Sequence, residues 1–174
     1  MNHSDYITHI NNPEDKPFLR SKLLDVNMRL FKTSGYYNHI IKLQCEYLKI
    51  LVLTKMEGYK KPHGMSAANA GLAFNIITIC RNRGKSNEYA QVMINPKVLG
   101  YGGAEVETES NCGSLTLKEP IKVARRELVE VAYYDENGIM NINTFGRNDC
   151  GFTIQHEIDH NLGILITDTT RAII

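Results

Sequence analysis

The stretch His156-Glu157-Ile158-Asp159-His160 places two imidazoles four residues apart, with a carboxylate directly after the first. On a helix, positions i and i+4 lie on one face, so both rings can point at the same metal ion. Glu157 lies one step around the helix, where its carboxylate can reach a water molecule held by that ion. The pattern therefore predicts metal-assisted attack on a carbonyl group. The alternative is an ordinary helix on which two histidines happen to share a face.

The identity of the third metal ligand decides which kind of site this is, because a catalytic zinc-type centre needs three protein ligands and an open position. Metzincin proteases extend the motif to HExxHxxGxxH. Gly163 falls on that glycine, but Ile166 replaces the final histidine, and no further His, Glu or Cys follows His160. We therefore expect the ligand to come from upstream, where Cys112 stands out because small and polar residues surround it in a predicted turn. The upstream candidates are His3, His9, His39, His63, Cys45, Cys80, Cys112 and Cys150.

The composition is that of an ordinary folded protein, and 174 residues favour a single domain spanning 1–174. The 20 basic and 19 acidic residues give no charge excess of the kind that binds nucleic acid or an anionic membrane. No apolar run approaches the roughly 20 residues that span a bilayer. The first residues, Met1 to Asp5, have neither the basic start nor the apolar stretch of a signal peptide. We expect a cytoplasmic protein with no nucleic-acid or membrane partner.

The hydrophobic pattern predicts an α+β fold in which antiparallel sheets wrap around one central helix, the one that carries the two histidines. A helix is expected over residues 34–57, because Ile41, Cys45, Leu48 and Val52 form one apolar stripe. It should stop at Gly58 and Pro62. The motif helix should open at residue 149 or 151 and end near Leu162, before Gly163.

Strands are predicted from short apolar or alternating runs. Val129, Val131 and Tyr133 share one face of such a run, and Asp135-Glu136-Asn137-Gly138 is a strong hairpin turn. The first thirty residues are expected to form an extended arm, residues 63–71 a loop, and residues 164–174 a short strand and a tail. The predicted strands cover residues 74–80, 92–94 (ended by Asn95-Pro96), 98–106 with glycine bulges, 115–117, 128–134 and 140–145.

With Cys112 placed ahead of the two histidines, the chain resembles the peptide deformylase family. That family carries three ordered motifs, GxGxAAxQ, EGCxS and HExDH. The corresponding stretches here are Pro62-His63-Gly64-Met65-Ser66-Ala67-Ala68-Asn69, Ser110-Asn111-Cys112-Gly113-Ser114 and Gln155-His156-Glu157-Ile158-Asp159-His160. The third motif is intact and the first two are divergent. Ile94-Asn95-Pro96 and the Asp135–Gly138 hairpin extend the resemblance over nearly the whole chain.

The resemblance implies one divalent metal ion bound by Cys112, His156 and His160. Ferrous iron is native in many family members, with zinc, nickel or cobalt as substitutes, and a thiolate with two imidazoles suits iron or zinc. The implied reaction removes the formyl group from the N-terminal methionine of newly made proteins. Glu157 would act as the general base. The backbone N–H of Gly113 and, at the glutamine position, the side-chain amide of Asn69 would stabilise the developing oxyanion.

Three of the departures from the family motifs bear on the expected chemistry. Asn69 is one methylene shorter than the usual glutamine, which removes about 1.5 Å of reach. Ser110 and Asn111 replace a glutamate and a glycine, so a carboxylate near the metal ligands is missing and the turn geometry can change. Changes around metal ligands commonly cost about 10–100-fold in affinity or activity.

The same resemblance assigns substrate binding to Gly64, His63, Phe152 and Thr153. His63 lies where an aliphatic residue is usual, which makes the pocket for the methionine side chain less apolar. The implied partners are nascent formyl-methionyl peptides, with a transient contact to the ribosome. The sequence lacks the long C-terminal helix of some deformylases, so no ribosome contact through such a helix is expected.

Two alternatives stay open beside an active deformylase. The divergent motifs favour a deformylase-like amidase with weak activity or a different N-acyl substrate. A metal-binding or interaction module without catalysis is the other alternative. Glu157 argues against that module, because a purely structural metal needs no base and prefers a closed fourth position.

Overall fold

The computed structural model describes residues 7–54 and 61–169, and its centre is one antiparallel sheet. Strands that follow one another in the sequence also pair, in the order β1-β2-β3-β4-β5. The α+β class and the antiparallel pairing are confirmed, with one continuous sheet in place of several. The strands are β1 (Gly64–Ser66), β2 (Ile76–Arg81), β3 (Tyr89–Ser110), β4 (Ile121–Tyr134) and β5 (Met140–Gly146).

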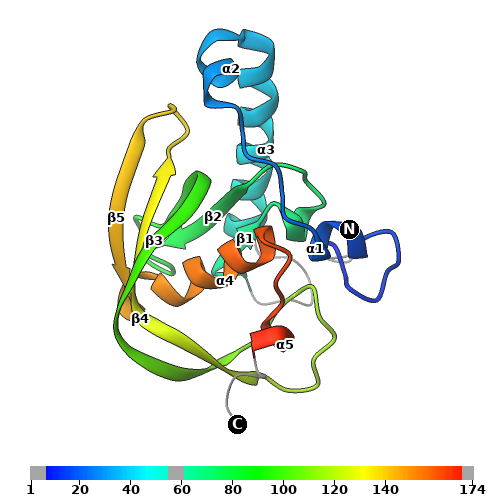
Figure 1. The fold of residues 1–174 in the computed structure, drawn as a ribbon, viewed down its shortest axis with the longest axis vertical. Coiled ribbons are helices and arrows are strands. Elements are labelled where there is room, and N and C mark those ends of the chain that lie inside the picture. Colours follow the sequence, from blue (N-terminus) through cyan, green and yellow to red (C-terminus); the bar gives the residue numbers. More distant parts are fainter. Residues whose placement is uncertain (1–6, 55–60, 170–174) are drawn as a thin grey trace.

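Five α-helices and two short 3₁₀ turns accompany the sheet in the described residues (Figure 1). None of these helices combines the length and the apolar character that a bilayer-spanning segment needs. The helices are α1 (Lys16–Arg20), α2 (Met28–Thr33), α3 (Gly35–Leu53), α4 (Gly151–Asn161) and α5 (Ile166–Thr169), and the 3₁₀ turns are η2 (Ala68–Ala70) and η3 (Arg147–Asp149).

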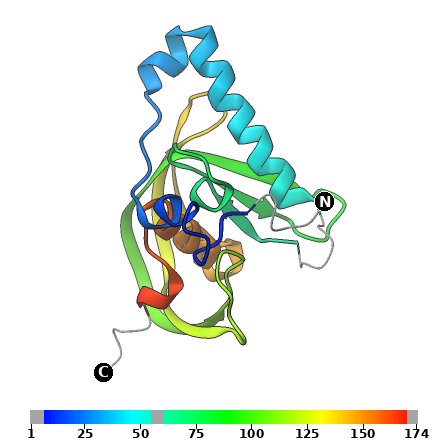
Figure 2. The same cartoon turned by 90° about the vertical axis from the view of Figure 1, so that its right-hand side faces the viewer.

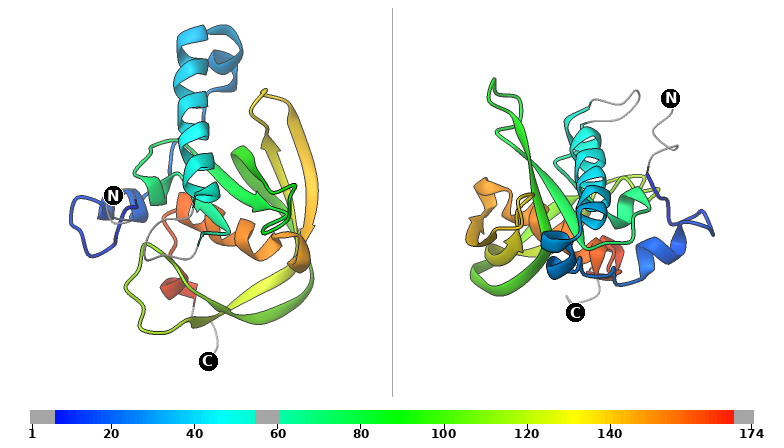
Figure 3. Two further views of the ribbon diagram at one scale, coloured as in Figure 1. Left: turned by 180° about the vertical axis from the view of Figure 1, so that it is seen from behind. Right: turned by 90° about the horizontal axis from the view of Figure 1, so that it is seen from above.

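Helices α3 and α4 pack on opposite faces of the sheet. Along β2, Ile76 and Cys80 join the cluster that includes the stripe of α3, whereas Ile77 and Ile79 join the cluster that includes Ile154 of α4. This follows from strand geometry, since successive side chains point to opposite faces. Figure 3 shows α3 (cyan) beside the green strands, with α4 (orange) below it in the left-hand view. The sheet is thus covered on both faces where the strands are fully buried.

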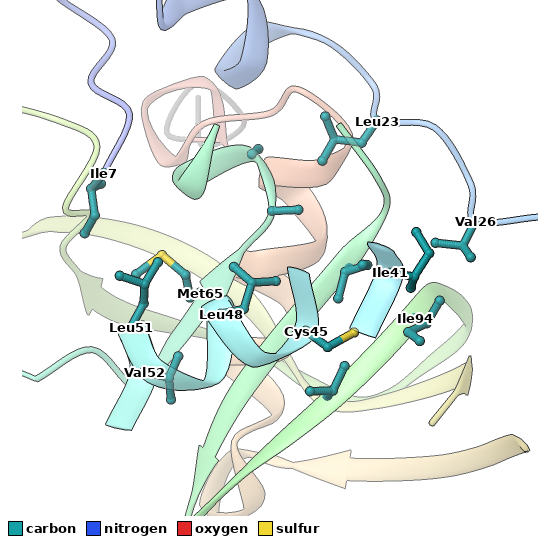
Figure 4. Packing of buried hydrophobic residues seen from close by; sticks show 14 of the residues in the cluster. Ile7, Leu23, Val26, Ile41, Cys45, Leu48, Leu51, Val52, Met65 and Ile94 are labelled. Atoms are coloured by element: carbon teal, nitrogen blue, oxygen red, sulfur yellow. The ribbon is translucent and has the colours of Figure 1, made fainter. Parts of the chain in front are cut away.

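The stripe predicted for α3 is confirmed, because Ile41, Cys45, Leu48 and Val52 are all buried (Figure 4). The helix begins after Ser34, whose hydroxyl accepts a hydrogen bond from the N–H of Tyr37. It ends at Leu53, four residues before the predicted end at residue 57, because the next residue is already extended. The predicted stop at Gly58 lies outside the described residues.

The predicted strand end at Asn95-Pro96 is wrong, because β3 continues through it as a bulge. Asn95 has a φ of 52° and the register with β4 shifts between Ile94 and Lys97. The side chain of Asn95 stabilises the bulge: Oδ1 accepts from the N–H of Val26 at 2.7 Å and Nδ2 donates to its carbonyl at 2.8 Å. The glycine bulges predicted further along β3 are confirmed by two more register shifts and by a φ of 71° at Gly103.

Four local predictions are wrong, each where the apolar pattern is short. The first thirty residues, expected to be extended, contain α1 and the start of α2. The expected loop at 63–71 contains β1 and η2. Residues 115–117 form a loop rather than a strand, and the expected strand after residue 164 is the short helix α5. The hairpin turn is confirmed by the bond from the N–H of Gly138 to the carbonyl of Asp135 at 2.9 Å. The alternation of Val129, Val131 and Tyr133 is also confirmed, since all three are buried.

Candidate metal centre

Helix α4 carries the two motif histidines, and a close backbone approach at Gly151 together with two side-chain anchors sets its position. Gly151 opens it, as one of the two predicted starts, and a Cβ there would lie 2.7 Å from the carbonyl oxygen of Phe145. The side chain of Gln155 bonds both backbone groups of Arg126 on β4, at 3.2 and 2.9 Å. At the other end, Nδ2 of Asn161 donates to the carbonyl of Ile76 on β2 at 3.0 Å. The helix is therefore held against two strands of the sheet.

Cys112, His156 and His160 converge at one point, although about a quarter of the chain separates the cysteine from the histidines. Sγ of Cys112 lies 3.2 Å from Nε2 of His160, which lies 3.2 Å from Nε2 of His156. The three donor atoms are all within 4.8 Å of one another. One sulfur and two nitrogens at this spacing can all bind a single ion, and within the described part of the chain no other group of this kind is present.

Burial keeps both imidazoles neutral. It is the largest cause that lowers the pKa of His160 to about 4 and the pKa of His156 well below its ordinary value, and the positive charge of Arg125 acts in the same direction. A neutral imidazole offers a lone pair to a metal. Among the described residues, the Nδ1 atoms of both rings are buried without a hydrogen-bond partner, so each Nε2 is directed at the cluster by packing alone.

Cys112 occupies a turn after β3 and packs against Val123 of β4 and Ile166 of α5. Burial raises the pKa of its thiol to about 12, while the backbone N–H groups of Ser114 and Leu115 act in the opposite direction. A thiol in such a place becomes a thiolate only beside a cation, which is what a bound metal supplies. The donor set and its burial therefore fit a divalent metal ion.

Glu157 lies beside this cluster and is 5 % exposed. Burial raises the pKa of its carboxyl to about 8, and the backbone N–H of Ser66 partly offsets that rise. Gly64 of β1 packs directly against it: a Cβ at that position would lie 2.9 Å from Cγ of Glu157 and 2.7 Å from Cγ2 of Thr153. The absence of a side chain at residue 64 is thus what lets β1 approach α4 so closely.

Asn69 has a hydrogen bond at each end of its amide. Its Oδ1 accepts from the hydroxyl of Ser66, and its Nδ2 donates to the hydroxyl of Ser114 at 2.6 Å. One of the two N–H groups of this amide therefore donates to Ser114. The short side chain consequently joins η2 to the turn that holds Cys112.

A cavity of about 720 Å³ contains nearly all of the residues that the sequence assigns to a site. His160 is the exception, since it lies behind the cavity wall and is buried. The sequence-predicted residues that line the cavity are His63, Gly64, Asn69, Cys112, Gly113, Phe152, Thr153, His156 and Glu157.

A model of the family described as Polypeptide deformylase matches residues 23–173. The chain belongs to this family. It is 30% identical over 152 residues to a peptide deformylase from Chloroflexus aurantiacus, covering 76% of this chain and 80% of that protein. It is 32% identical over 171 residues to the peptide deformylase of a Streptococcus pyogenes strain, covering 91% of this chain and 83% of that one. These relatives agree with the family suggested by the three sequence motifs.

The fold of this deformylase family member is also similar to solved structures. A peptide deformylase from Synechococcus elongatus in complex with actinonin matches with a TM-score of 0.70 and 23% identity, covering 94% of this chain and 76% of that one. At that identity the similarity shows the fold, and it agrees with the mixed helices and antiparallel sheet described above.

Arg125 is a residue of this site that the sequence analysis missed. It lies on β4, is 7 % exposed and pairs with Asp159 of α4 at 2.5 Å. Its second guanidinium nitrogen, Nη2, is buried with no hydrogen-bond partner among the described residues. The burial of Arg125 could have been predicted from the sequence. The alternation that buries Val129 and Val131 also puts residue 125 on the inner face of the strand.

Proposed function

We propose that this chain removes the formyl group from formyl-methionyl peptides by hydrolysis, with a divalent metal ion held by Cys112, His156 and His160. The single observation that carries the proposal is the meeting of these three donor atoms beside the buried carboxylate of Glu157, at the wall of one cavity. Membership of the deformylase family supports it independently. Ferrous iron is the native ion we propose, with zinc, nickel or cobalt able to replace it.

Three residues of the cavity have a part in the proposed reaction. When bound, the metal supplies a Lewis acid that lowers the pKa of water and polarises a carbonyl oxygen. Glu157 takes the proton of the attacking water and returns it to the amine that leaves. The backbone N–H of Gly113 and the other N–H of the Asn69 amide donate to the oxyanion that develops on the formyl oxygen.

The proposed binding site for the methionine side chain consists of His63, Gly64, Phe152 and Thr153, which all line the cavity. Phe152 and Thr153 lie on the first turn of α4, just before the metal ligands. Burial and the charge of Arg83 both lower the pKa of His63, so this imidazole is neutral at pH 7. A neutral ring can accept an apolar side chain on its face, although less readily than an aliphatic residue.

A second candidate function is a slower amidase that acts on a different N-acyl substrate. The bond between Asn69 and Ser114 favours it, since an amide already engaged with the protein is a weaker donor to a substrate. The loss of one oxyanion donor typically costs about 10²–10³-fold in kcat. Substrates that carry acetyl in place of formyl distinguish the two functions.

The test measures bound metal and formate release together. The protein is purified without air, its metal content is determined, and formate release from formyl-Met-Ala-Ser is assayed beside a Glu157→Gln variant. Glu107→Gln is the matched control, because Glu107 is an exposed carboxylate on β3. We expect formate release by the parent and by the control, and none by Glu157→Gln with its metal retained.

Two results would contradict the proposal. Metal bound without formate release would leave the amidase, which acetyl-Met-Ala-Ser then tests, or a binding module. A Cys112→Ser variant that keeps its full metal content would remove the sulfur from the ligand set. The cytoplasmic location, the single domain and a transient ribosome contact stay predictions, and the binding of purified ribosomes in a sedimentation assay tests the last of these.

A further inference from the structure

Residues 7–12 form a segment that is bonded to both sides of the cavity, and we call it the arm. The N–H of Thr8 donates to the carbonyl of Asn69 at 2.7 Å, and the Thr8 hydroxyl donates to the carbonyl of Ala68 at 2.8 Å. Two residues later, the N–H of Ile10 donates to the carbonyl of Ser114 at 3.1 Å. Figure 2 shows this dark-blue segment beside the yellow-green loop that follows β3. The arm therefore joins the η2 turn to the turn that holds Cys112.

On either side of Thr8, the arm directs two side chains at the cavity. Ile7 and His9 both line it, together with Leu115 and Thr116 of the opposite loop. Nδ1 of His9 accepts from the N–H of Asn11 at 3.3 Å, so Nε2 carries the proton and donates to the hydroxyl of Thr116 at 3.1 Å. His9 is thus held in one tautomer and one orientation. Ile7 is buried and belongs to the main hydrophobic cluster (Figure 4).

The arm lies outside residues 23–173, the part of the chain that the family model matches. The residues proposed for the metal, the base and the methionine pocket all fall inside that range. When a methionine side chain occupies the pocket at Phe152 and Thr153, the later residues of a peptide have only the other walls of the cavity to contact, and His9 and Thr116 belong to those walls.

We propose that the arm is a specificity-determining wall of the cavity, at which His9 and Thr116 contact the peptide beyond its first residue. The identity of the occupant as a peptide rests on the proposed function. The oxygen of the Thr116 hydroxyl accepts from His9 and, at 3.4 Å, from Nδ2 of Asn11, so its own O–H is left to donate to a peptide carbonyl. The ring of His9 holds that hydroxyl in place, and Ile7 holds the arm in the core beside them. Peptides of two or more residues therefore gain affinity from the arm, and a single amino acid does not.

The experiment compares the affinities of a long and a short ligand for the full zinc-loaded chain. The tripeptide Met-Ala-Ser and methionine amide are each titrated by NMR, a method that measures millimolar as well as micromolar dissociation constants. The variants are His9→Ala and Thr116→Val, which remove the same contact from opposite sides. His39→Ala is the matched control, since His39 is exposed on α3 away from the cavity.

We expect His9→Ala to weaken Met-Ala-Ser binding by about three- to tenfold, the range for one lost hydrogen-bonded contact. Methionine amide should bind within twofold of the parent value, and His39→Ala should change neither affinity. Thr116→Val should repeat the result, and it replaces His9→Ala if that protein fails to fold. Equal weakening of both ligands, or of neither, by the variant that folds would overturn the proposal.

Formate release from formyl-Met-Ala-Ser is measured on the same samples, so the two proposals fail separately. A parent protein that releases no formate contradicts the proposed function. The difference in affinity between the long and the short ligand then still tests the arm, because it requires binding and no turnover.

Discussion

Gly64 is the position where the structure predicts the sharpest response to a single added methyl group. An alanine at residue 64 would put its Cβ 2.7 Å from Cγ2 of Thr153 and 2.9 Å from Cγ of Glu157. Ordinary carbon–carbon contacts lie at about 3.5 to 4.0 Å. Strand β1 and helix α4 must therefore separate by about 0.8 Å to admit the methyl group. Neither neighbour offers the far end of a flexible side chain, because a β-branched methyl and the inner carbon of a buried glutamate are both held in place.

The size of the effect follows from that separation. A misplacement of about 1 Å in a catalytic group can cost about 10²-fold in rate. Overpacking of a tight contact typically destabilises a protein by about 1–3 kcal/mol. We therefore expect Gly64→Ala to lower kcat/KM for formyl-Met-Ala-Ser by about 10²-fold, while the protein stays folded and keeps its metal, because the three atoms nearest to the added Cβ belong to Thr153 and Glu157 and not to a metal ligand.

The assay is formate release at several concentrations of the peptide, with metal content and urea unfolding measured on the same sample. Gly35→Ala is the matched control, since nothing lies within 4 Å of a Cβ at that position on the first turn of α3. The control should keep full activity and be unchanged or slightly more stable. A Gly64→Ala protein with kcat/KM within twofold of the parent would refute the tight contact between β1 and Glu157.

Three further predictions concern stability. Leu48→Ala should lower the free energy of unfolding by about 2–5 kcal/mol, because the side chain is fully buried in the main cluster, whereas Leu43→Ala on the exposed face of α3 should change it by less than about 1 kcal/mol. Asp159→Asn should cost about 3 kcal/mol in urea unfolding, since it leaves the buried charge of Arg125 without its carboxylate, and Glu107→Gln in an exposed pair should cost less than about 1 kcal/mol. Removal of the metal with a chelator should lower the melting temperature, and its return should restore it. The reason is that a ligand at about 1,000 times its dissociation constant adds about 4 kcal/mol to the free energy of unfolding. An unchanged melting temperature would contradict a tightly bound ion.

Local periodicity made much of the fold predictable from the sequence. The stripe of α3 and the alternation in β4 each follow from a repeat that one face of an element imposes on its own residues. The motif helix was located to within two residues because its histidines, its opening Gly151 and the terminating Gly163 are all local signals. Within one helix or strand, residues that are close in sequence are also close in space. A pattern that covers the whole element can therefore be recognised from the sequence alone.

Long-range contacts explain the predictions that were wrong. Asn95-Pro96 has the sequence of a strand end, but the bonds from the Asn95 side chain to Val26 allow β3 to continue as a bulge. The segment after residue 164 is apolar enough for a strand, yet it becomes α5 and packs Ile166 behind Cys112. Neither partner is near in sequence, so no local pattern could show the contact.

The two divergent motifs are also explained by contacts that cross the chain. Asn69 is shorter than the family glutamine, and its amide spans from Ser66 to Ser114, two residues beyond Cys112. Asn111 bonds the N–H of Cys112 through its own side chain at 3.0 Å, which holds the turn where the family has glycine. Asn69 thus bonds two serine hydroxyls, and Asn111 bonds the backbone N–H of the cysteine. The divergent motifs therefore have hydrogen bonds of their own around Cys112, whose sulfur lies 3.2 Å from Nε2 of His160.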